Sequence, residues 1–131
     1  MIICIDIGLK RIGVAFSPDG ILSLPSSAII RKNRNQASSE LSSILKQKEA
    51  KTLVVGLPMG GASEEEMKRR IEHFVSLIEF DGVIIYENEY GSSREALEFG
   101  VERITKAKDG KLDSLSAKII LDRYLDRKNR G

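Results

Sequence analysis

Two apolar runs separated by a tight turn open the chain, and they constrain its fold more than any other feature. Residues 1–17 read MIICIDIGLKRIGVAFS. The pattern predicts one strand over Ile2–Ile7 and a second over Arg11–Phe16, joined by a turn at Gly8. One acid, Asp6, interrupts the first run, and burying a carboxylate is costly unless a partner compensates its charge. Divalent cations such as Mg²⁺ prefer oxygen ligands, so a metal ion is the simplest such partner.

The rest of the chain predicts an α/β domain. The turn-forming residues 18–20 are followed by a third strand over Ile21–Ile30, which Pro25 makes irregular or places at an edge. A three-strand antiparallel meander is therefore followed by parallel strands that alternate with crossover helices. We expect one domain over residues 1–131, with a five-stranded mixed sheet flanked by helices. The later strands are predicted over Thr52–Leu57 and Gly82–Tyr86, and the helices over Asn35–Glu49, from Ser63 onward, over Ser93–Lys106 and over Leu112–Lys128.

Composition sets broad limits on compartment and partners. With 131 residues, 41% of them hydrophobic and 31% charged, the chain fits one compact domain. A net charge of +2 neither demands nor excludes a nucleic-acid partner. The single cysteine, Cys4, is expected to be a core residue in a reducing compartment. No stretch has the length of a membrane span and no signal-peptide pattern is present, so we expect a cytoplasmic protein without a membrane partner.

Three further acids could form a site together with Asp6. Glu87 and Glu89 follow a predicted parallel strand and share one face, and Asp113 lies on the apolar face of the last helix near its start. The carboxyl ends of parallel strands open a crevice, so these acids could meet there and hold one or two Mg²⁺ or Mn²⁺ ions. Each acid also has a simpler explanation: Asp113 can stabilise the first turn of a helix, and either glutamate can merely end a strand.

Basic and hydroxyl side chains could contact phosphate near these acids. Lys10 and Arg11 follow Asp6 closely and either bind phosphate or form a solvated turn. Ser92 and Ser93 open a predicted helix, where backbone N–H groups can hold a phosphate, although capping alone explains them. A further basic cluster, Arg31, Lys32 and Arg34, precedes the first long helix and could position a phosphate backbone.

Four stretches together resemble one protein family. They are DIGLKRIGVAFS (6–17), VVGLP (54–58), SSREA (92–96) and KLDSLSAKIILDRYLD (111–126). In this order they resemble the YqgF family, the pre-16S rRNA nucleases related to RuvC-type Holliday-junction resolvases. The resemblance implies a ribonuclease H-like fold and a metal-dependent nuclease that acts on structured RNA, with maturation of the 5′ end of pre-16S rRNA as its function.

The resemblance also implies roles for individual residues. The first-strand acid of the family falls on Asp6, and the acid of its last helix falls on Asp113. Relatives carry an Asp-Glu-Arg motif after a later strand, and aligning it on the serine pair places its Glu on Glu89. This chain has Asn88 and Tyr90 at the other two positions. The neighbouring Glu87 could then substitute as a ligand.

Alternative functions are open at this point. The chain could be a Holliday junction resolvase-like DNA endonuclease that acts on branched DNA. It could also be a non-catalytic RNA- or ribosome-associated binding protein, as the departures at Asn88 and Tyr90 suggest. The DIG sequence resembles the first phosphate loop of actin-like ATPases, but those need two such domains and this chain has room for one. A weak homodimer is a further possibility.

Overall fold

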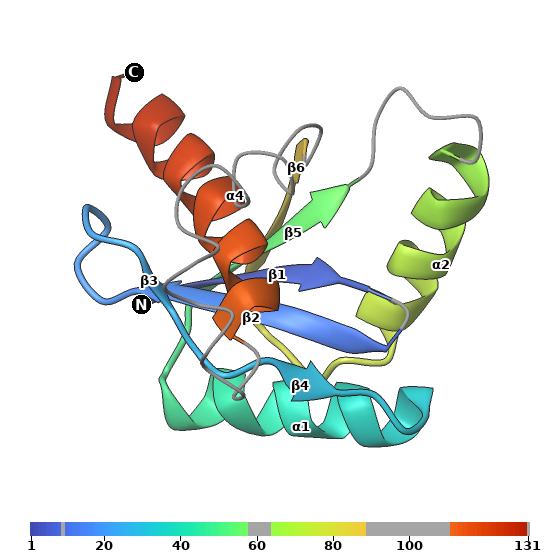
Figure 1. The fold of residues 1–131 in the computed structure, drawn as a ribbon. Helices are drawn as coiled ribbons and strands as arrows, with labels where there is room; N and C mark the ends of the chain where they lie inside the picture. Colours follow the sequence, from blue (N-terminus) through green and yellow to red (C-terminus); the bar gives the residue numbers. More distant parts are fainter. Residues whose placement is uncertain (9, 58–63, 89–110, 131) are drawn as a thin grey trace.

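A mixed six-stranded sheet forms the centre of the protein, as the computed structural model describes it for residues 1–8, 10–57, 64–88 and 111–130 (Figure 1). The strands lie in the order β3-β2-β1-β5-β6, and β4 also pairs with β2. Neighbours β1, β5 and β6 are parallel, whereas β2 is antiparallel to β1, β3 and β4. The bounds are β1 Ile2–Ile7, β2 Arg11–Ser17, β3 Leu24–Pro25, β4 Ile29–Ile30, β5 Thr52–Leu57 and β6 Val83–Asn88.

Helices cover both faces of the sheet. In Figure 1, α4 (Lys111–Arg130) crosses the face turned to the viewer, while α1 (Arg34–Gln47) and α2 (Glu64–Ser76) pack on the opposite face. Alternation along β1 divides its side chains between two cores. Ile3, Ile5 and Ile7 join the core beneath α1 and α2, whereas Ile2 and Cys4 join the core beneath α4.

The mixed sheet flanked by helices confirms the fold class predicted from the sequence, but the third predicted strand is divided. Instead of one strand over Ile21–Ile30, the chain forms β3 and β4, so the sheet has six strands where we expected five. β3 ends at Pro25, although one further backbone bond, from the Ser26 N–H to the Val14 carbonyl oxygen at 2.8 Å, still joins the chain to β2. Residue pairing with β2 resumes at Ile29, in β4.

The strand predicted over Gly82–Tyr86 differs from the structure in length and in burial. β6 extends to Asn88, so Glu87 belongs to the strand and does not follow it. β6 is also less buried than expected, since the Val83 side chain is 59% exposed. The reason is its position at the end of the strand order, where β5 is the one neighbour that it has among the described strands.

The helices follow the predicted pattern with small shifts. α1 begins one residue before the predicted start, because Asn33 and Gln36 form a reciprocal capping box at its N-terminus. α2 begins at Glu64, and Ser63 lies outside the described residues, as does the helix predicted over Ser93–Lys106. Within the described part of the chain, no helix combines the length and the apolarity that crossing a membrane requires.

Candidate active site at the carboxyl end of the central strands

Asp6 lies near the carboxyl end of β1, in a row of residues that runs across the sheet and contains a glycine on each neighbouring strand. It follows Cys4 at the strand period of two, so it lies on the face that α4 covers, and it is half-buried there. Its cross-strand partner on β2 is Gly13. On the other side, Gly56 is the next residue of β5 after Val55, the partner of Ile5. Because both of these residues are glycines, neither neighbouring strand places a side chain next to Asp6.

The start of α4 is fixed to the sheet beside this row. Ser114 is fully buried, and its Oγ accepts a hydrogen bond from the Val14 N–H at 3.0 Å. This N–H faces the gap between β3, which pairs with β2 from Ala15 onward, and β4, which pairs with β2 up to Ile12. The serine therefore completes the ladder where β3 and β4 leave it open. It also holds the first turn of α4 next to Gly13.

Asp113 therefore has its backbone in the first turn of α4, one residue before the anchored serine. Its side chain lies outside the part of the structure that is described. The topology brings the elements that carry Asp6 and Asp113 together, as the sequence predicted. The contact between their carboxylates stays a prediction.

Glu87 has a partner that the sequence did not indicate. Its side chain is buried in β6, with Oε2 at 2.6 Å from Nη2 of Arg127 and Oε1 at 3.3 Å from Nη1. Among the described residues, none makes a hydrogen bond of good geometry to Oε2, so the close guanidinium charge is what compensates it. Arg127 comes from the last turns of α4. The ion pair therefore fastens this end of the helix to the edge strand.

The remaining predicted site residues divide into two groups. Lys10 and Arg11 are both exposed at the turn that follows β1. Glu89, Ser92 and Ser93 lie outside the described residues, as do Tyr90 and the predicted helix that the serines begin. Among the residues that are described, no group of three or more acids, histidines or cysteines is placed to hold a metal ion. A ligand set of three such residues would therefore need at least one side chain outside the description, as those of Glu89 and Asp113 are.

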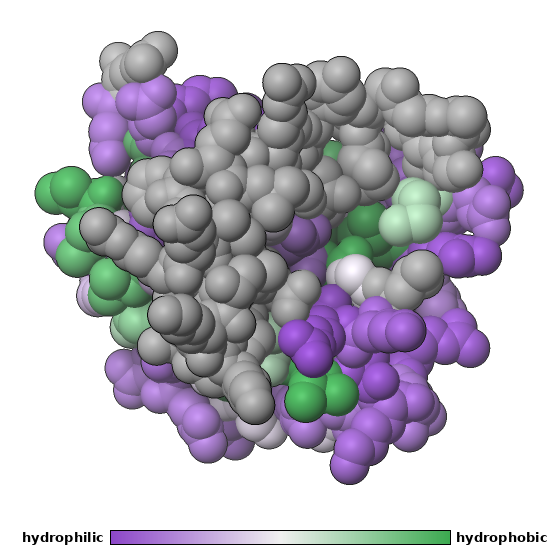
Figure 2. All heavy atoms as spheres, in the orientation of Figure 1, coloured by the Kyte–Doolittle hydropathy of each residue, from purple (hydrophilic) through white to green (hydrophobic). Residues whose placement is uncertain are grey.

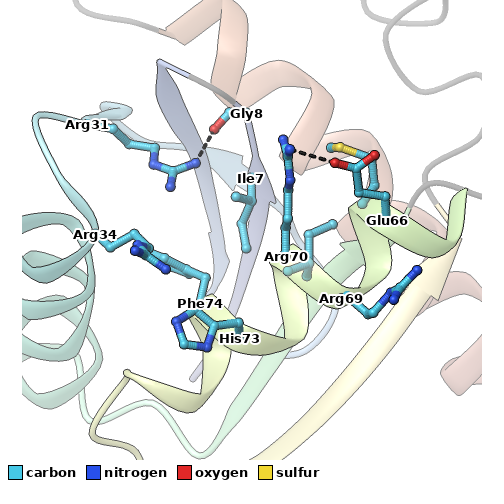
Figure 3. A pocket seen from close by; sticks show the side chains of 11 residues that line it. Ile7, Gly8, Arg31, Arg34, Glu66, Arg69, Arg70, His73 and Phe74 are labelled. Atoms are coloured by element: carbon cyan, nitrogen blue, oxygen red, sulfur yellow. Dashed lines mark hydrogen bonds and ion pairs between the residues drawn. The ribbon is translucent and has the colours of Figure 1, made fainter. Parts of the chain in front are cut away.

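An arginine-lined pocket lies on the opposite face of β1 from Asp6. It has a volume of about 700 Å³, and Ile7 and Gly8 line it at the end of β1. Figure 3 shows Arg31 and Arg34 reaching it from the segment at the start of α1, and Arg70 from α2. The Arg31–Arg34 cluster was visible in the sequence, whereas the contribution of α2 was missed. The signal was available, because Met67, Ile71 and Phe74 define the buried stripe of α2 and Arg70 directly precedes one of them.

The solved structures most useful for comparison are resolvases. The chain is similar to the fowlpox virus Holliday junction resolvase with a TM-score of 0.58 and 17% identity, covering 96% of this chain and 98% of the other. It is similar to T. thermophilus RuvC, solved with a Holliday junction substrate, with a TM-score of 0.60 and 9% identity, covering 99% and 97%. At these identities the likeness shows the fold alone. The fold is the ribonuclease H-like fold of the RuvC-type resolvases.

Sequence comparison shows the family. The family model described as "RuvX: Holliday junction resolvase" matches residues 1–127, and the chain belongs to this family. Relatives named "Putative pre-16S rRNA nuclease" include one from Sulfurovum sp. (strain NBC37-1), 55% identical with 92% of this chain and 94% of the relative covered. One from Campylobacter jejuni (strain RM1221) is 56% identical, with 93% and 95% covered. One from Helicobacter pylori (strain HPAG1) is 48% identical, with 95% and 94% covered. The family resemblance predicted from the sequence is confirmed.

Proposed function

We propose that this protein is a divalent-metal-dependent nuclease that matures the 5′ end of pre-16S rRNA in the cytoplasm. The names of relatives about half identical over nearly the whole chain support the reaction and the substrate. The observation that carries the chemistry is the position of Asp6. It is a half-buried carboxylate at the carboxyl end of the parallel strands, with glycine on the neighbouring strand and the anchored start of α4 nearby.

The residues around Asp6 suit Mg²⁺ or Mn²⁺. Both ions favour carboxylate oxygens, and the glycine neighbours add no side chain that would compete for the Asp6 carboxylate. Asp6 and Asp113 would hold the metal, together with one glutamate at the end of β6. Because Arg127 already compensates Glu87, Glu89 is the better candidate for that third ligand. When bound, the metal would supply an activated water and charge stabilisation for phosphodiester hydrolysis.

Side chains of this chain then have separate roles in the reaction. Asp6, held in β1 by pairing on both sides, fixes the position of the site relative to the sheet. Lys10 and Arg11, exposed at the end of the same hairpin, are placed to contact the phosphates of a bound strand. Neither role needs a protein nucleophile, because water attacks the phosphorus.

The direct test is cleavage of a precursor 16S rRNA end by the purified protein with Mg²⁺, with Mn²⁺ and with EDTA. We expect cleavage only with a divalent ion, and a loss of at least about 100-fold in the Asp6→Asn variant. Asp81→Asn is the matched control, because Asp81 is an exposed acid that precedes β6 far from this row. Cleavage by Asp6→Asn at the rate of the control variant would refute the assignment of Asp6.

The family description and the fold favour a second substrate, branched DNA. Offering a four-way DNA junction and the precursor RNA to the same preparation separates these two nuclease functions. Preferential cutting of the junction would replace the RNA proposal with the resolvase proposal.

A non-catalytic nucleic-acid-binding role is the candidate from another class. The specific observation in its favour is that Glu87 is already bound by Arg127 and is followed by Asn88, an amide where relatives of the resembled family carry an acid. Calorimetric titration with Mg²⁺ and Mn²⁺ distinguishes the two roles. RNA binding without any measurable metal binding would support the non-catalytic role. Sedimentation in the same buffers would test the predicted weak homodimer.

A further inference from the structure

We propose that the arginine-lined pocket between the end of β1, the start of α1 and α2 binds a phosphate group of the nucleic-acid strand. We name it the phosphate pocket and define it by its charged lining residues Arg31, Arg34, Glu66, Arg69 and Arg70. The proposal rests on the proposed function only in taking a nucleic acid as the ligand. It adds a binding site on the face of β1 opposite to Asp6.

Charge is the first observation that supports it. Arginines outnumber acids in the lining, where Glu66 is the acid among the described residues. Glu66 is paired with Arg70 at 2.6 Å, while Arg34 forms no ion pair with any described residue. A concave site with excess positive charge attracts anions, and guanidinium groups match phosphate oxygens in geometry. Figure 2 shows hydrophilic side chains gathered over this part of the molecule, around α1 and α2.

Preorganisation is the second observation. Arg31 donates from Nη1 to the Gly8 carbonyl oxygen at 2.6 Å, and its guanidinium lies 5.4 Å from the centre of the Phe74 ring. These contacts use one face and one N–H of the guanidinium, so other N–H groups are available to a ligand. Arg31 is half-buried and therefore loses less freedom on binding than a fully exposed side chain. Figure 3 shows the Arg31–Gly8 contact at the rim of the pocket.

Shape is the third observation. The floor is apolar, formed by Ile7, Met67, Ile71 and Phe74, and the charged groups stand around it. A volume of about 700 Å³ is in the range of small-molecule sites and accommodates one nucleotide unit. An apolar floor with a cationic rim fits a nucleotide better than a free inorganic anion, because the sugar and base also need an apolar surface.

The position of the pocket indicates how it would serve the nuclease. Ile7 and Gly8 directly follow Asp6, so a strand held in the phosphate pocket passes close to the end of β1. The contact is made to phosphate and carries no sequence information. It would set the register of the strand relative to the site that contains Asp6.

The test measures RNA binding in EDTA, where no cleavage occurs. The probe is a fluorescently labelled single-stranded RNA, with fluorescence anisotropy as the readout, and the variants are Arg34→Ala, Arg70→Ala and Glu66→Gln. Lys68→Ala is the matched control, because Lys68 is an exposed cation on α2 that does not line the pocket. All four positions are exposed, so thermal unfolding should show that the variants fold normally.

We expect Kd to rise about threefold or more for each arginine variant, and to fall for Glu66→Gln because the repulsion of phosphate is removed. The slope of log K against log salt should become shallower by about 0.7 for each arginine lost. Lys68→Ala should change Kd less than either arginine variant does. A preference of the wild type for 5′-phosphorylated over 5′-hydroxyl RNA identifies the bound group as a terminal phosphate, and equal binding identifies an internal phosphodiester.

Arginine variants that bind RNA as tightly as Lys68→Ala would overturn the proposal. The result of this binding test is independent of the result of the cleavage test for the proposed function. A protein that fails to cleave, yet loses RNA affinity in these variants, would refute the nuclease assignment and keep the phosphate pocket. In an active nuclease the arginine variants should raise KM for the RNA and leave kcat within about twofold, because they act on binding of the strand.

Discussion

The hydrogen bond from the Val14 N–H to Ser114 Oγ yields the sharpest prediction about stability. Replacing Ser114 with alanine leaves a buried backbone donor without its acceptor in the gap between β3 and β4. An unsatisfied buried N–H costs about 1–3 kcal/mol. Alanine is a better helix former than serine by about 0.5 kcal/mol, which offsets part of the cost. We therefore expect a net loss of about 1–2 kcal/mol in the free energy of unfolding.

Urea unfolding measures this loss, with Ser116→Ala as the matched control. Ser116 is also buried in α4, but its hydroxyl forms no hydrogen bond with a described residue, so its replacement gains the same helix propensity without losing a side-chain hydrogen bond. For a chain of this size the expected fall in Tm is about 4 °C per kcal/mol. Hydrogen exchange at the Val14 amide should also become faster. Equal stability of the two variants would refute the reasoning, since Val14 would then have another acceptor.

Three further predictions test other contacts. Arg127→Ala should lower the free energy of unfolding by about 1–2 kcal/mol, because it leaves the buried Glu87 carboxylate uncompensated, and adding Glu87→Gln should recover part of that loss in the same urea assay. Gly8→Ala should destabilise by about 1–3 kcal/mol, because the new Cβ would lie 2.7 Å from the Arg11 carbonyl oxygen; an unchanged Tm would show that the turn can adjust. The backbone N–H groups of Leu22 and Ile21 hold the pKa of Asp19 below its usual 3.8. The ionised Asp19 therefore stabilises the folded protein above pH 3.8, and this stabilisation is lost as the pH falls through the folded-state pKa. An NMR titration of Asp19 with a midpoint at or above 3.8 would contradict this.

The sequence predicted well those elements whose signals are local. β1 and β5 begin and end where expected, because their mainly apolar runs are bounded by a turn residue or by Pro58. The division of the third strand could not be predicted, since it depends on where β2 finds pairing partners. Pro25 indicated irregularity, but the return of the chain at Ile29 is set by tertiary contacts.

The candidate site was predictable to a similar extent. Asp6 stands out because an acid between two isoleucines is exceptional, and the topology places it beside the start of α4. The engagement of Glu87 could not be foreseen, because its partner Arg127 is 40 residues away in the sequence. The phosphate pocket likewise joins the start of α1 to α2, and neither segment predicts it alone. Local sequence patterns could not predict these contacts, because each one joins segments that are far apart in the sequence.

The contact between Ser114 and β2 also bears on the order in which the protein folds. It joins residues 100 positions apart, and the helix that closes the gap in the sheet is the last described element of the chain. The β1–β2 hairpin can form early from neighbouring residues, but the edge of β2 stays incomplete until α4 arrives. Assembly of the region around Asp6 is therefore a late step in folding. A chain interrupted before α4 would leave the apolar residues beneath this helix uncovered, which favours aggregation over a partly active domain.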